Sequence, residues 1–338
     1  MNDVKQILVI TLSNIGDVVL TLPVIGALKE NFRGARIDVV VGTRAGEIFE
    51  ADPRIGKMYV YDKSLSPFGK LNFLLNLRKN KYDLVIDLRN SLLSFLLCPR
   101  FSSKPPHQNF WCGGKPALNL PEGVIHKIDA HLLKVKSLGL NTASNSYQMW
   151  ISQIDADNAR KLLKKKGISD SDEVVCVSPG AKSHIKRWSE GNFAKVCDKL
   201  IDELKVKVVF VGDASDGAIC ERILNRMRSY AVSVAGETNL RELAWSIKRS
   251  RLLITNDSAP LHIAGSVGTP SVAIFGPTDY RKYGPREGLG TALRKGLHCS
   301  PCEVAQCRYN LECMKAVEAE EVFEAARNIL SERKEPRT

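Results

Sequence analysis

Apolar residues of this chain fall into short runs that alternate with amphipathic stretches. Gln6–Ile10, Ile37–Val41 and Asp83–Leu88 are rich in Val, Ile and Leu, and helical patterns separate them. Continuous apolar strands divided by helices are typical of a parallel sheet covered on both faces. The other elements expected in the first half are the strands Met58–Tyr61 and Tyr147–Ile151 and the helices Asp17–Asn31, Gly69–Lys79 and Lys127–Leu138. Pro23 must lie in the first turns of its helix or kink it.

A short polar segment, Gly167–Glu173, interrupts this alternation, which then starts again. We therefore expect an α/β fold of two doubly wound domains, residues 1–168 and 169–318, with the charged helix Asp155–Lys166 closing the first. The elements expected in the second half are the strands Val174–Val177, Val206–Val211, Val232–Val234, Leu252–Thr255 and Ser271–Phe275 and the helices Glu190–Leu204, Asp216–Arg228, Leu240–Lys248, Ala259–Val267 and Glu320–Glu332.

The size and composition agree with two ordinary globular domains. The chain has 338 residues, of which 44% are apolar and 25% charged. No run approaches the roughly 18 apolar residues of a membrane span. The first ten residues lead straight into a strand, so we expect no secretory signal. The nine cysteines are odd in number, and five of them are scattered along the chain, which favours a reducing, cytoplasmic location over a disulfide framework.

The net charge of +12 favours anionic partners. Nucleic acid, anionic lipid and phosphorylated substrates all qualify, and a merely solvated basic surface is the alternative. No basic and aromatic pattern of a known nucleic-acid module is present. The chain also lacks a Gly-x-Gly-x-x-Gly fingerprint and a P-loop, so a dehydrogenase is not supported. Two Rossmann-like halves without these motifs are typical of an enzyme whose ligands lie between its domains.

The segment Asn256–His262 follows an apolar strand and leads into a helix. Helix N-termini bind anionic ligands, because their first N–H groups are unpaired. Gly276–Thr278 follows the next strand, so both loops should face the same crevice. Asp257 can accept hydrogen bonds from ribose or sugar hydroxyls, and Ser258 can hold a phosphate. The alternative is a capping Asp257 beside a buried His262.

The segment Ser178–Trp188 joins the first strand of the second domain to its first helix. It contains the cations Lys182, Lys186 and Arg187 among several small residues. Lysine supplies a point charge and arginine can hold two oxygens, so this segment suits a diphosphate. The alternative is a solvated basic loop with Trp188 packed on the core.

The segment Thr11–Asp17 follows the first strand and opens the first helix. Gly16 permits a tight turn. The carboxylate of Asp17 is placed where it can take a proton from an attacking hydroxyl. The alternative is that Asp17 is a helix N-cap.

Four cysteines lie close together near the C-terminus: Cys299, Cys302, Cys307 and Cys313. Two interpretations stay open. One is a structural zinc site, and the other is a compact loop of reduced thiols. The second pair lacks the close spacing of common zinc ribbons, which favours the thiols.

The three polar loops, in this order, resemble those of the heptosyltransferases, glycosyltransferase family 9. Residues 87–91 with Ser94 resemble an acceptor-domain motif of the lipopolysaccharide branch. The matching segments are Ser13–Pro23, Asp87–Ser91 with Ser94, Pro179–Ala181, Lys186–Trp188, Asn256–His262, Phe275–Thr278 and Ser300–Met314. Asp155-Ala156-Asp157 resembles the Asp-x-Asp of metal-dependent sugar transferases, but it starts a helix, where Asp is favoured as a cap.

The resemblance implies a GT-B architecture, in which two Rossmann-like domains face a central cleft and a last helix, within 319–338, crosses back to the first domain. It implies transfer with inversion at the anomeric carbon, with no cofactor and no bound metal. Asp17 is then the general base and Lys186 stabilises the leaving diphosphate. The donor-binding residues implied are Ser178, Gly180, Ala181, Lys182, Arg187, Asp257, Ser258, Ala259, His262, Gly276, Pro277 and Thr278. The acceptor-binding residues implied are Ser13, Asn14, Gly16, Arg89, Asn90 and Ser91.

One residue departs from the family pattern. Ala259 stands where the family usually has Gly, which matters if the backbone there has a positive φ or approaches the donor closely.

The expected donor is ADP-L-glycero-D-manno-heptose, and the expected acceptor is the lipid A–Kdo inner core of lipopolysaccharide. Because that acceptor is lipid-anchored, we expect a peripheral enzyme on the cytoplasmic face of the inner membrane, with no nucleic acid as partner. The irregular segment Pro99–Gly123, with Arg100 and Lys104, is expected to meet the acceptor. The alternatives are transfer of another sugar to another surface glycan, a sugar-nucleotide epimerase, and a nucleotide or nucleic-acid binder without turnover.

Overall fold

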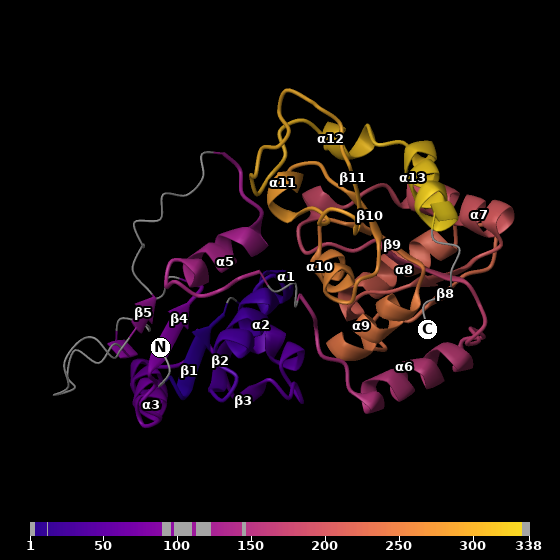
Figure 1. Cartoon of the computed structure of the whole chain (residues 1–338). Helices are drawn as coiled ribbons and strands as arrows, with labels where there is room; N and C mark the ends of the chain where they lie inside the picture. Colours follow the sequence, from indigo (N-terminus) through magenta and orange to yellow (C-terminus); the bar gives the residue numbers. More distant parts are fainter. Residues whose placement is uncertain are drawn as a thin grey trace. The chain divides into compact units, whose positions relative to one another are not determined.

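The computed structural model describes residues 4–11, 13–89, 96–97, 110–112, 123–143 and 147–332. The chain divides into two compact units, Met1–Trp150 and Ile151–Thr338, each built around one parallel sheet. Figure 1 shows the helices that accompany each sheet. Within the described residues, no helix is both long enough and apolar enough to cross a bilayer.

The sheet of the first unit has the strand order β3-β2-β1-β4-β5, and all its pairs are parallel. In the central strand, Leu8 and Ile10 pack in a core cluster with Leu77 of helix α3. Ile7 and Val9 are fully buried and, by the alternation of a strand, point to the opposite face. The elements are β1 Gln6–Ile10, α1 Ile15–Val19, α2 Leu22–Asn31, β2 Arg36–Gly42, a 3₁₀ turn Thr43–Ile48, β3 Ile55–Tyr61, α3 Pro67–Arg78, β4 Leu84–Asp87, β5 Phe110–Cys112 and α5 Lys127–Lys136.

The helix expected over 17–31 is two helices, α1 and α2. Pro23 occupies the first turn of α2. A proline there costs no hydrogen bond, because the first N–H groups of a helix lack intrahelical partners. The expectation that Pro23 lies in the first turns is therefore confirmed. The strand expected at Tyr147–Ile151 is not formed, since these residues pair with no strand among those described.

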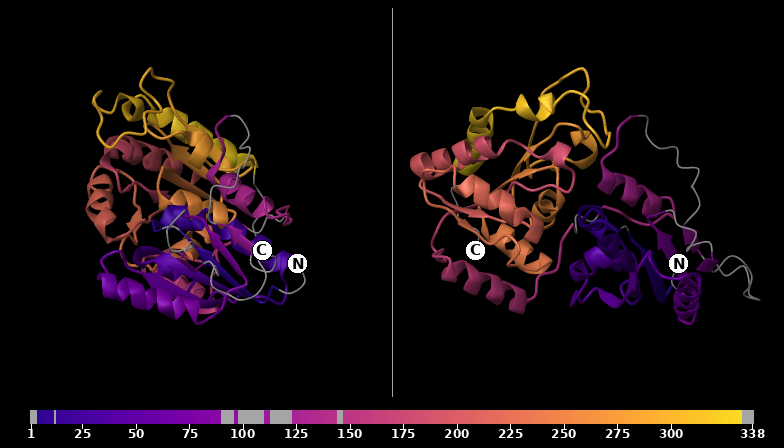
Figure 2. Two further views of the ribbon diagram at one scale, coloured as in Figure 1. Left: turned by 90° about the vertical axis from the view of Figure 1, so that its left-hand side faces the viewer. Right: turned by 180° about the vertical axis from the view of Figure 1, so that it is seen from behind.

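The sheet of the second unit has the order β11-β10-β9-β6-β7-β8 and is also parallel. On β6, Val175 and Val177 pack in a core cluster with α7, α8 and α13. Cys176 points the other way, and its thiol donates to the carbonyl of Ser246 on α9 at 3.6 Å. Helices thus cover both faces, as the two views of Figure 2 show for this unit. This explains why its strands are continuously apolar.

The second unit contains more elements than the sequence predicted. The strand β11 is half-exposed and contains Gly, so its pattern carried no signal. The elements are α6 Gln153–Lys165, β6 Val174–Ser178, a 3₁₀ turn His184–Lys186, α7 Glu190–Leu204, β7 Lys207–Phe210, a 3₁₀ turn Ala214–Asp216, α8 Gly217–Leu224, β8 Val232–Ser233, α9 Leu240–Arg249, β9 Leu252–Asn256, α10 Ala259–Ser266, β10 Ser271–Ile274, α11 Tyr280–Tyr283, β11 Gly290–Leu293, α12 Glu312–Lys315 and α13 Ala319–Glu332.

Two helices belong to a different unit from the one that the sequence suggested. Helix α6 was expected to close the first domain, but it packs against α9 of the second unit. The last helix, α13, was expected to cross back to the first domain. Its residues Val322, Phe323 and Ala326 are buried in the core cluster of the second unit, beside α7. Both helices turn an apolar face towards the second unit, and the buried face of α6 includes Ala156, Ala159 and Leu163.

A capping box and a buried ion pair fix the start of α6. Asp155 accepts the backbone N–H of Ser152, and the side chain of Ser152 accepts that of Asp155. Nε of Arg241 on α9 lies 2.9 Å from Oδ2 of Asp155, and both side chains are nearly buried. Burial raises the pKa of Asp155, but the hydrogen bonds from Arg241 and Ser152 outweigh it and hold the pKa below its usual value. Asp155 therefore does cap this helix, but from the third helical position of the capping box, while the N-cap residue itself is Ser152.

We predict that Arg241→Ala lowers the free energy of unfolding of the second unit by about 3–5 kcal/mol, because it leaves a buried carboxylate unpaired. The depressed pKa of Asp155 means that its contribution in the wild type is present above the ordinary carboxyl pKa and is lost as the pH falls below it. The difference between variant and wild type should therefore shrink in acid. Urea unfolding at neutral and acid pH measures both effects. Arg222→Ala, which removes an exposed pair with Glu190, is the matched control and should cost about 1 kcal/mol or less.

Candidate active site

Three polar segments of the second unit meet at one edge of its sheet. Strands β6, β9 and β10 are neighbours and parallel, so their carboxyl ends lie at the same edge. Ser178–Trp188 follows β6, Asn256–Ser258 ends β9 and opens α10, and Gly276–Thr278 follows β10. The structure thus brings together the segments that the sequence singled out as a donor site. This is also the edge at which open α/β sheets bind ligands.

The side chain of Asn256 ties two of these segments together. It is fully buried. Its Nδ2 donates to the carbonyl of Pro179 at 2.7 Å, and its Oδ1 accepts the backbone N–H of Trp188 at 3.1 Å. Trp188 is anchored in turn, because its indole N–H donates to the carbonyl of Val317 at 2.9 Å. Asn256 belongs to a segment that was predicted as part of the site, but its role as a tie was not predicted.

Lys186 and Asp257 form an ion pair within this edge. Nζ of Lys186 lies 2.6 Å from Oδ2 of Asp257. The carboxylate is 7% exposed and the lysine side chain 32% exposed, so the cation keeps access to solvent. An anionic ligand arriving at this edge meets Lys186 already held in place. Both residues were predicted for this site, and their direct contact was not.

The remaining cations of the segment differ in how firmly they are held. Nε of Arg187 donates to the carbonyl of Ala181 at 2.9 Å, which closes the loop 181–187 on itself. Lys182 and His184 are exposed. Trp188 packs edge-to-face on Phe193 in the core, so the alternative interpretation of this segment was right about Trp188. It does not account for the ion pair at Lys186.

Asp216 is a site residue that the sequence analysis missed. It follows β7, and its carboxylate packs against two glycines at the same edge of the sheet. A Cβ on Gly180 would lie 1.9 Å from Oδ1 of Asp216, and a Cβ on Gly212 would lie 2.6 Å from its Oδ2. Burial raises the pKa of Asp216, nearby Asp213 adds to this, and Arg187 opposes it. The signal in the sequence was Gly212, shortly after strand β7, followed by an acidic turn.

The N-terminus of α10 has no side-chain cap. Ser258 is the N-cap residue, and its hydroxyl lies 3.2 Å from that of Thr255 instead of accepting a helix N–H group. Ala259 is the first helical residue and does not have a positive φ, so the methyl group in place of glycine causes no backbone strain. The hydroxyl of Ser178, at the end of β6, is buried without a hydrogen-bond partner among the described residues. Buried polar groups normally have partners, so this hydroxyl fits a ligand contact.

The loop Gly276–Thr278 is held from behind by the cysteine-bearing segment. The hydroxyl of Ser300 donates to the carbonyl of Gly276 at 2.6 Å. The backbone N–H groups of Cys302 and Glu303 both donate to the carbonyl of Pro277, at 3.0 and 2.8 Å. Thr278 is 8% exposed, as is His262 of α10, whose ring lies 6.4 Å from that of Tyr283. The cysteine segment therefore supports the site.

The four clustered cysteines are free thiols, and the zinc interpretation is not supported. Among the described residues, which include all four, no group of His, Cys, Asp or Glu side chains is arranged to hold a metal ion. The Sγ of Cys307 accepts the backbone N–H groups of Tyr309 and Leu311, each at 3.3 Å. Burial raises the pKa of Cys313, and the sulfur atoms nearby raise it further.

A second polar edge lies in the first unit. Asn14 is the N-cap residue of α1, and Asp17 stands in the first turn of that helix. The amide of Asn14 donates to Oδ2 of Asp17 at 2.9 Å. The alternative that Asp17 is itself the N-cap is therefore wrong. Gly42, at the end of β2, lets the loop that contains Ser13 pass close to this strand, since a Cβ on Gly42 would lie 2.9 Å from Cα of Ser13.

Arg89 comes to the same edge from the neighbouring strand. Ile10 of β1 pairs in register with Asp87 of β4, so the residues that follow these strands are neighbours. The backbone N–H of Arg89 donates to Oδ1 of Asp87 at 2.9 Å. The predicted acceptor residues Asn90 and Ser91, like Arg100 and Lys104, lie outside the described residues.

We predict that Asn256→Ala destabilises the second unit by about 2–4 kcal/mol, because it leaves a buried N–H and a buried carbonyl unpaired. It should also speed amide hydrogen exchange across residues 178–188, which lose their tie to β9. Urea unfolding and hydrogen exchange with mass analysis measure the two effects. The exposed Asn225→Ala should stay within about 0.5 kcal/mol of wild type. Unchanged exchange in residues 178–188 of the Asn256 variant would contradict the assigned tie.

Comparisons with known proteins agree on one family. A sequence model described as glycosyltransferase family 9 (heptosyltransferase) matches residues 71–312. The chain is 28% identical to lipopolysaccharide heptosyltransferase 3 of Escherichia coli K12 over 331 residues, which covers 94% of this chain and 96% of that protein. It is 26% identical to lipooligosaccharide heptosyltransferase 2 of Haemophilus influenzae, covering 86% of this chain and 88% of the relative.

Solved structures share the fold along nearly the whole chain. A family 9 glycosyltransferase from Veillonella parvula superposes with a TM-score of 0.80 at 24% identity, covering 98% of both chains. The ADP-heptose lipopolysaccharide heptosyltransferase II of E. coli superposes with a TM-score of 0.77 at 20% identity, covering 98% of this chain and all of the other. The fold is therefore GT-B, with two Rossmann-like domains. Since the family match spans more than half of its residues, the chain belongs to glycosyltransferase family 9 and is a glycosyltransferase.

Proposed function

We propose that this enzyme transfers a heptose from ADP-L-glycero-D-manno-heptose to the lipid A–Kdo inner core of lipopolysaccharide, with inversion and without a bound metal. The relatives support the sugar and the acceptor, because they are named as heptosyltransferases of lipopolysaccharide or lipooligosaccharide. A structural neighbour, WaaC of E. coli, was solved with ADP. The observation that carries the chemistry is the solvent-accessible Lys186, held by Asp257 at the ligand-binding edge of the second sheet.

The donor is assigned to the second unit. Its diphosphate needs positive charge and N–H donors, which Lys182, Lys186, Arg187 and the uncapped start of α10 supply. Negative charge that develops on the departing diphosphate is stabilised by Lys186, which is the role usually given to a metal ion. Asp257 then accepts hydrogen bonds from donor hydroxyls. The buried hydroxyl of Ser178 and the loop Gly276–Thr278 complete the donor contacts.

The acceptor is assigned to the first unit. Asp17 takes the proton of the acceptor hydroxyl, whose oxygen forms a bond to the anomeric carbon as the bond from that carbon to the diphosphate oxygen breaks. Attack from the face opposite the leaving group inverts the configuration. The amide of Asn14 orients the carboxylate of Asp17. Arg89, at the same edge, offers a cation to the anionic inner core. A lipid-anchored acceptor places the enzyme at the cytoplasmic face of the inner membrane.

We predict that Asp17→Ala and Lys186→Ala each lower kcat by about a hundredfold or more, because each removes a group that acts on the transition state. Transfer to purified acceptor is measured by product mass, and urea unfolding shows whether the fold is intact. The exposed residues Asp62 and Lys161 give matched controls, Asp62→Asn and Lys161→Ala, which should keep the wild-type rate. A wild-type rate in either site variant would remove that residue from the mechanism.

A panel of sugar nucleotides tests the donor and the reaction type. We expect ADP-heptose to add one heptosyl residue to the acceptor, and nucleotides of other sugars to react about tenfold more slowly or worse. Removal of divalent metals with EDTA should leave the rate unchanged. A product in which the sugar nucleotide alone is altered would identify an epimerase, and a strict need for a divalent ion would contradict the role of Lys186.

A further inference from the structure

Helix α3 of the first unit is apolar on two faces. Leu74 and Leu77 are buried, and Leu77 belongs to the core cluster under the helix. A second row of apolar residues points away from the core: Phe68 is 80% exposed, Leu71 50% and Leu75 46%. Residues spaced by three and four positions lie on the same side of a helix, so these three form one stripe.

This stripe is larger than the isolated apolar residues that any protein surface shows. It continues towards Leu96, which is 44% exposed, because Nε and Nη2 of Arg78 at the end of α3 both donate to the Leu96 carbonyl. We call Phe68, Leu71, Leu75 and Leu96 the α3 patch. A helix that presents a second apolar face to solvent normally has a partner for it.

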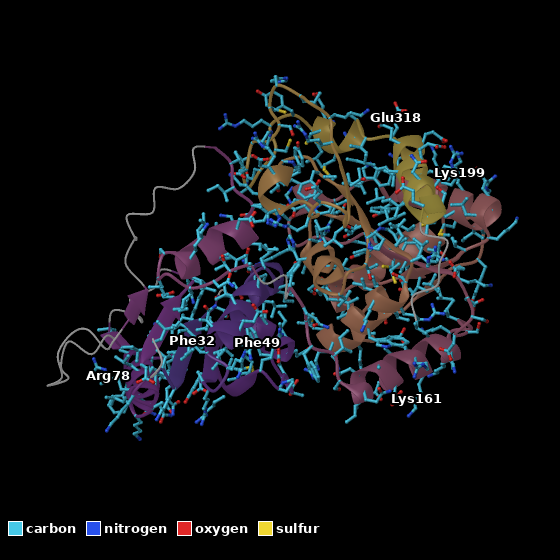
Figure 3. The ribbon with its side chains drawn as sticks, viewed as in Figure 1. Phe32, Phe49, Arg78, Lys161, Lys199 and Glu318 are labelled. Atoms are coloured by element: carbon cyan, nitrogen blue, oxygen red, sulfur yellow. The ribbon has the colours of Figure 1, made fainter. Side chains whose placement is uncertain are left out.

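The surroundings of the α3 patch are strongly basic. Residues 57–83 contain two acidic residues, Asp62 and Asp83, and six cations: Lys57, Lys63, Lys70, Arg78, Lys79 and Lys81. Six minus two leaves a net charge of +4 in this segment, a third of the +12 of the whole chain. Lys63, Lys70, Lys79 and Lys81 are exposed, and the described part of the chain shows no ion pair to any of them. Figure 3 shows Arg78 among the side chains of this helix.

We propose that α3 lies on the surface of an anionic lipid bilayer, with Phe68, Leu71 and Leu75 inserted between the headgroups and the surrounding lysines against lipid phosphates. A helix with an apolar stripe and a basic border binds such a surface in its plane. Positive charge next to the stripe is attracted to the anionic cytoplasmic leaflet.

A second copy of the chain fits the α3 patch less well. A symmetric dimer through this helix would bring two segments of charge +4 together, and like charges across an interface repel. Nucleic acid would use the lysines but would leave the apolar stripe in water.

The inference rests on the proposed function only for the purpose of membrane binding, which is to bring the enzyme to a lipid-anchored acceptor. Lipid binding itself needs no substrate.

The test is co-sedimentation with vesicles of phosphatidylcholine alone or mixed with phosphatidylglycerol. We expect the full-length protein to bind the mixed vesicles and to release as salt is raised. The variant Phe68→Ser/Leu71→Ser/Leu75→Ser should lower partitioning about tenfold or more. Lys70→Glu/Lys79→Glu should lower it by a similar factor, since each basic residue near an anionic surface contributes roughly fivefold.

Matched controls come from the second unit. Ile154 and Tyr230 are 72% and 77% exposed, and Lys161 and Lys165 lie exposed on α6. Ile154→Ser/Tyr230→Ser and Lys161→Glu/Lys165→Glu should therefore bind mixed vesicles as the wild type does. Wild-type vesicle binding by both α3 variants, or an equal loss in the controls, would overturn the proposal. Two other results would also overturn the proposal. One is a smaller hydrodynamic size of the serine variant, which would show that the α3 patch holds a dimer together. The other is a protein that retains DNA through the α3 patch but does not bind vesicles.

Failure of this inference and failure of the proposed function are separable. The α3 variants should keep the wild-type rate of transfer to a delipidated, water-soluble core acceptor, and Asp17→Ala should keep vesicle binding. If the wild type transfers no heptose but binds mixed vesicles through α3, the docking surface stands and the proposed function fails. If it transfers heptose to the soluble acceptor and ignores vesicles, the docking surface fails alone.

Discussion

The buried amide of Asn256 is the constraint on which the site of the second unit depends. It sits at the end of β9 and holds the backbone on either side of the basic loop, at Pro179 and at Trp188. The loop between these points carries Lys186, and the residue after Asn256 is the carboxylate that pairs with it. One side chain therefore sets the position of both members of the ion pair. An amide suits this place because it donates and accepts at once without a buried charge.

Much of the fold follows from the sequence because both sheets are covered on two faces. The apolar runs Val174–Val177 and Gln6–Ile10 were predicted as buried strands, and the structure confirms both, the first ending at Ser178. Gly167 was expected to stop α6 and does so with a φ of +83°. The failures have physical causes. Tyr147–Ile151 has strand-like residues but pairs with no strand among those described. Strand β11 pairs in register with β10, but its sequence Gly-Thr-Ala-Leu contains few bulky apolar residues, so it was not predicted.

The site was predictable as a set of loops and not as a set of contacts. The ends of β6, β9 and β10 had to meet once the sheet was parallel, so the three segments were found together. Lys186 and Asp257 are 71 residues apart, and nothing in their spacing foretells a distance of 2.6 Å. Asp216 was missed for a related reason. Gly212 lies just before it in the chain, but the closer contact is with Gly180 of the segment after β6, which the local sequence around Asp216 does not show.

The packing of Asp216 against Gly180 and Gly212 also limits how this enzyme can change over evolutionary time. The carboxylate occupies the volume that a methyl group on either glycine would need. A larger residue at position 180 or 212 thus fits only if residue 216 has a shorter side chain or a different rotamer. The three positions should vary together among related enzymes, so a replacement harmless in one relative is harmful when transplanted alone into another.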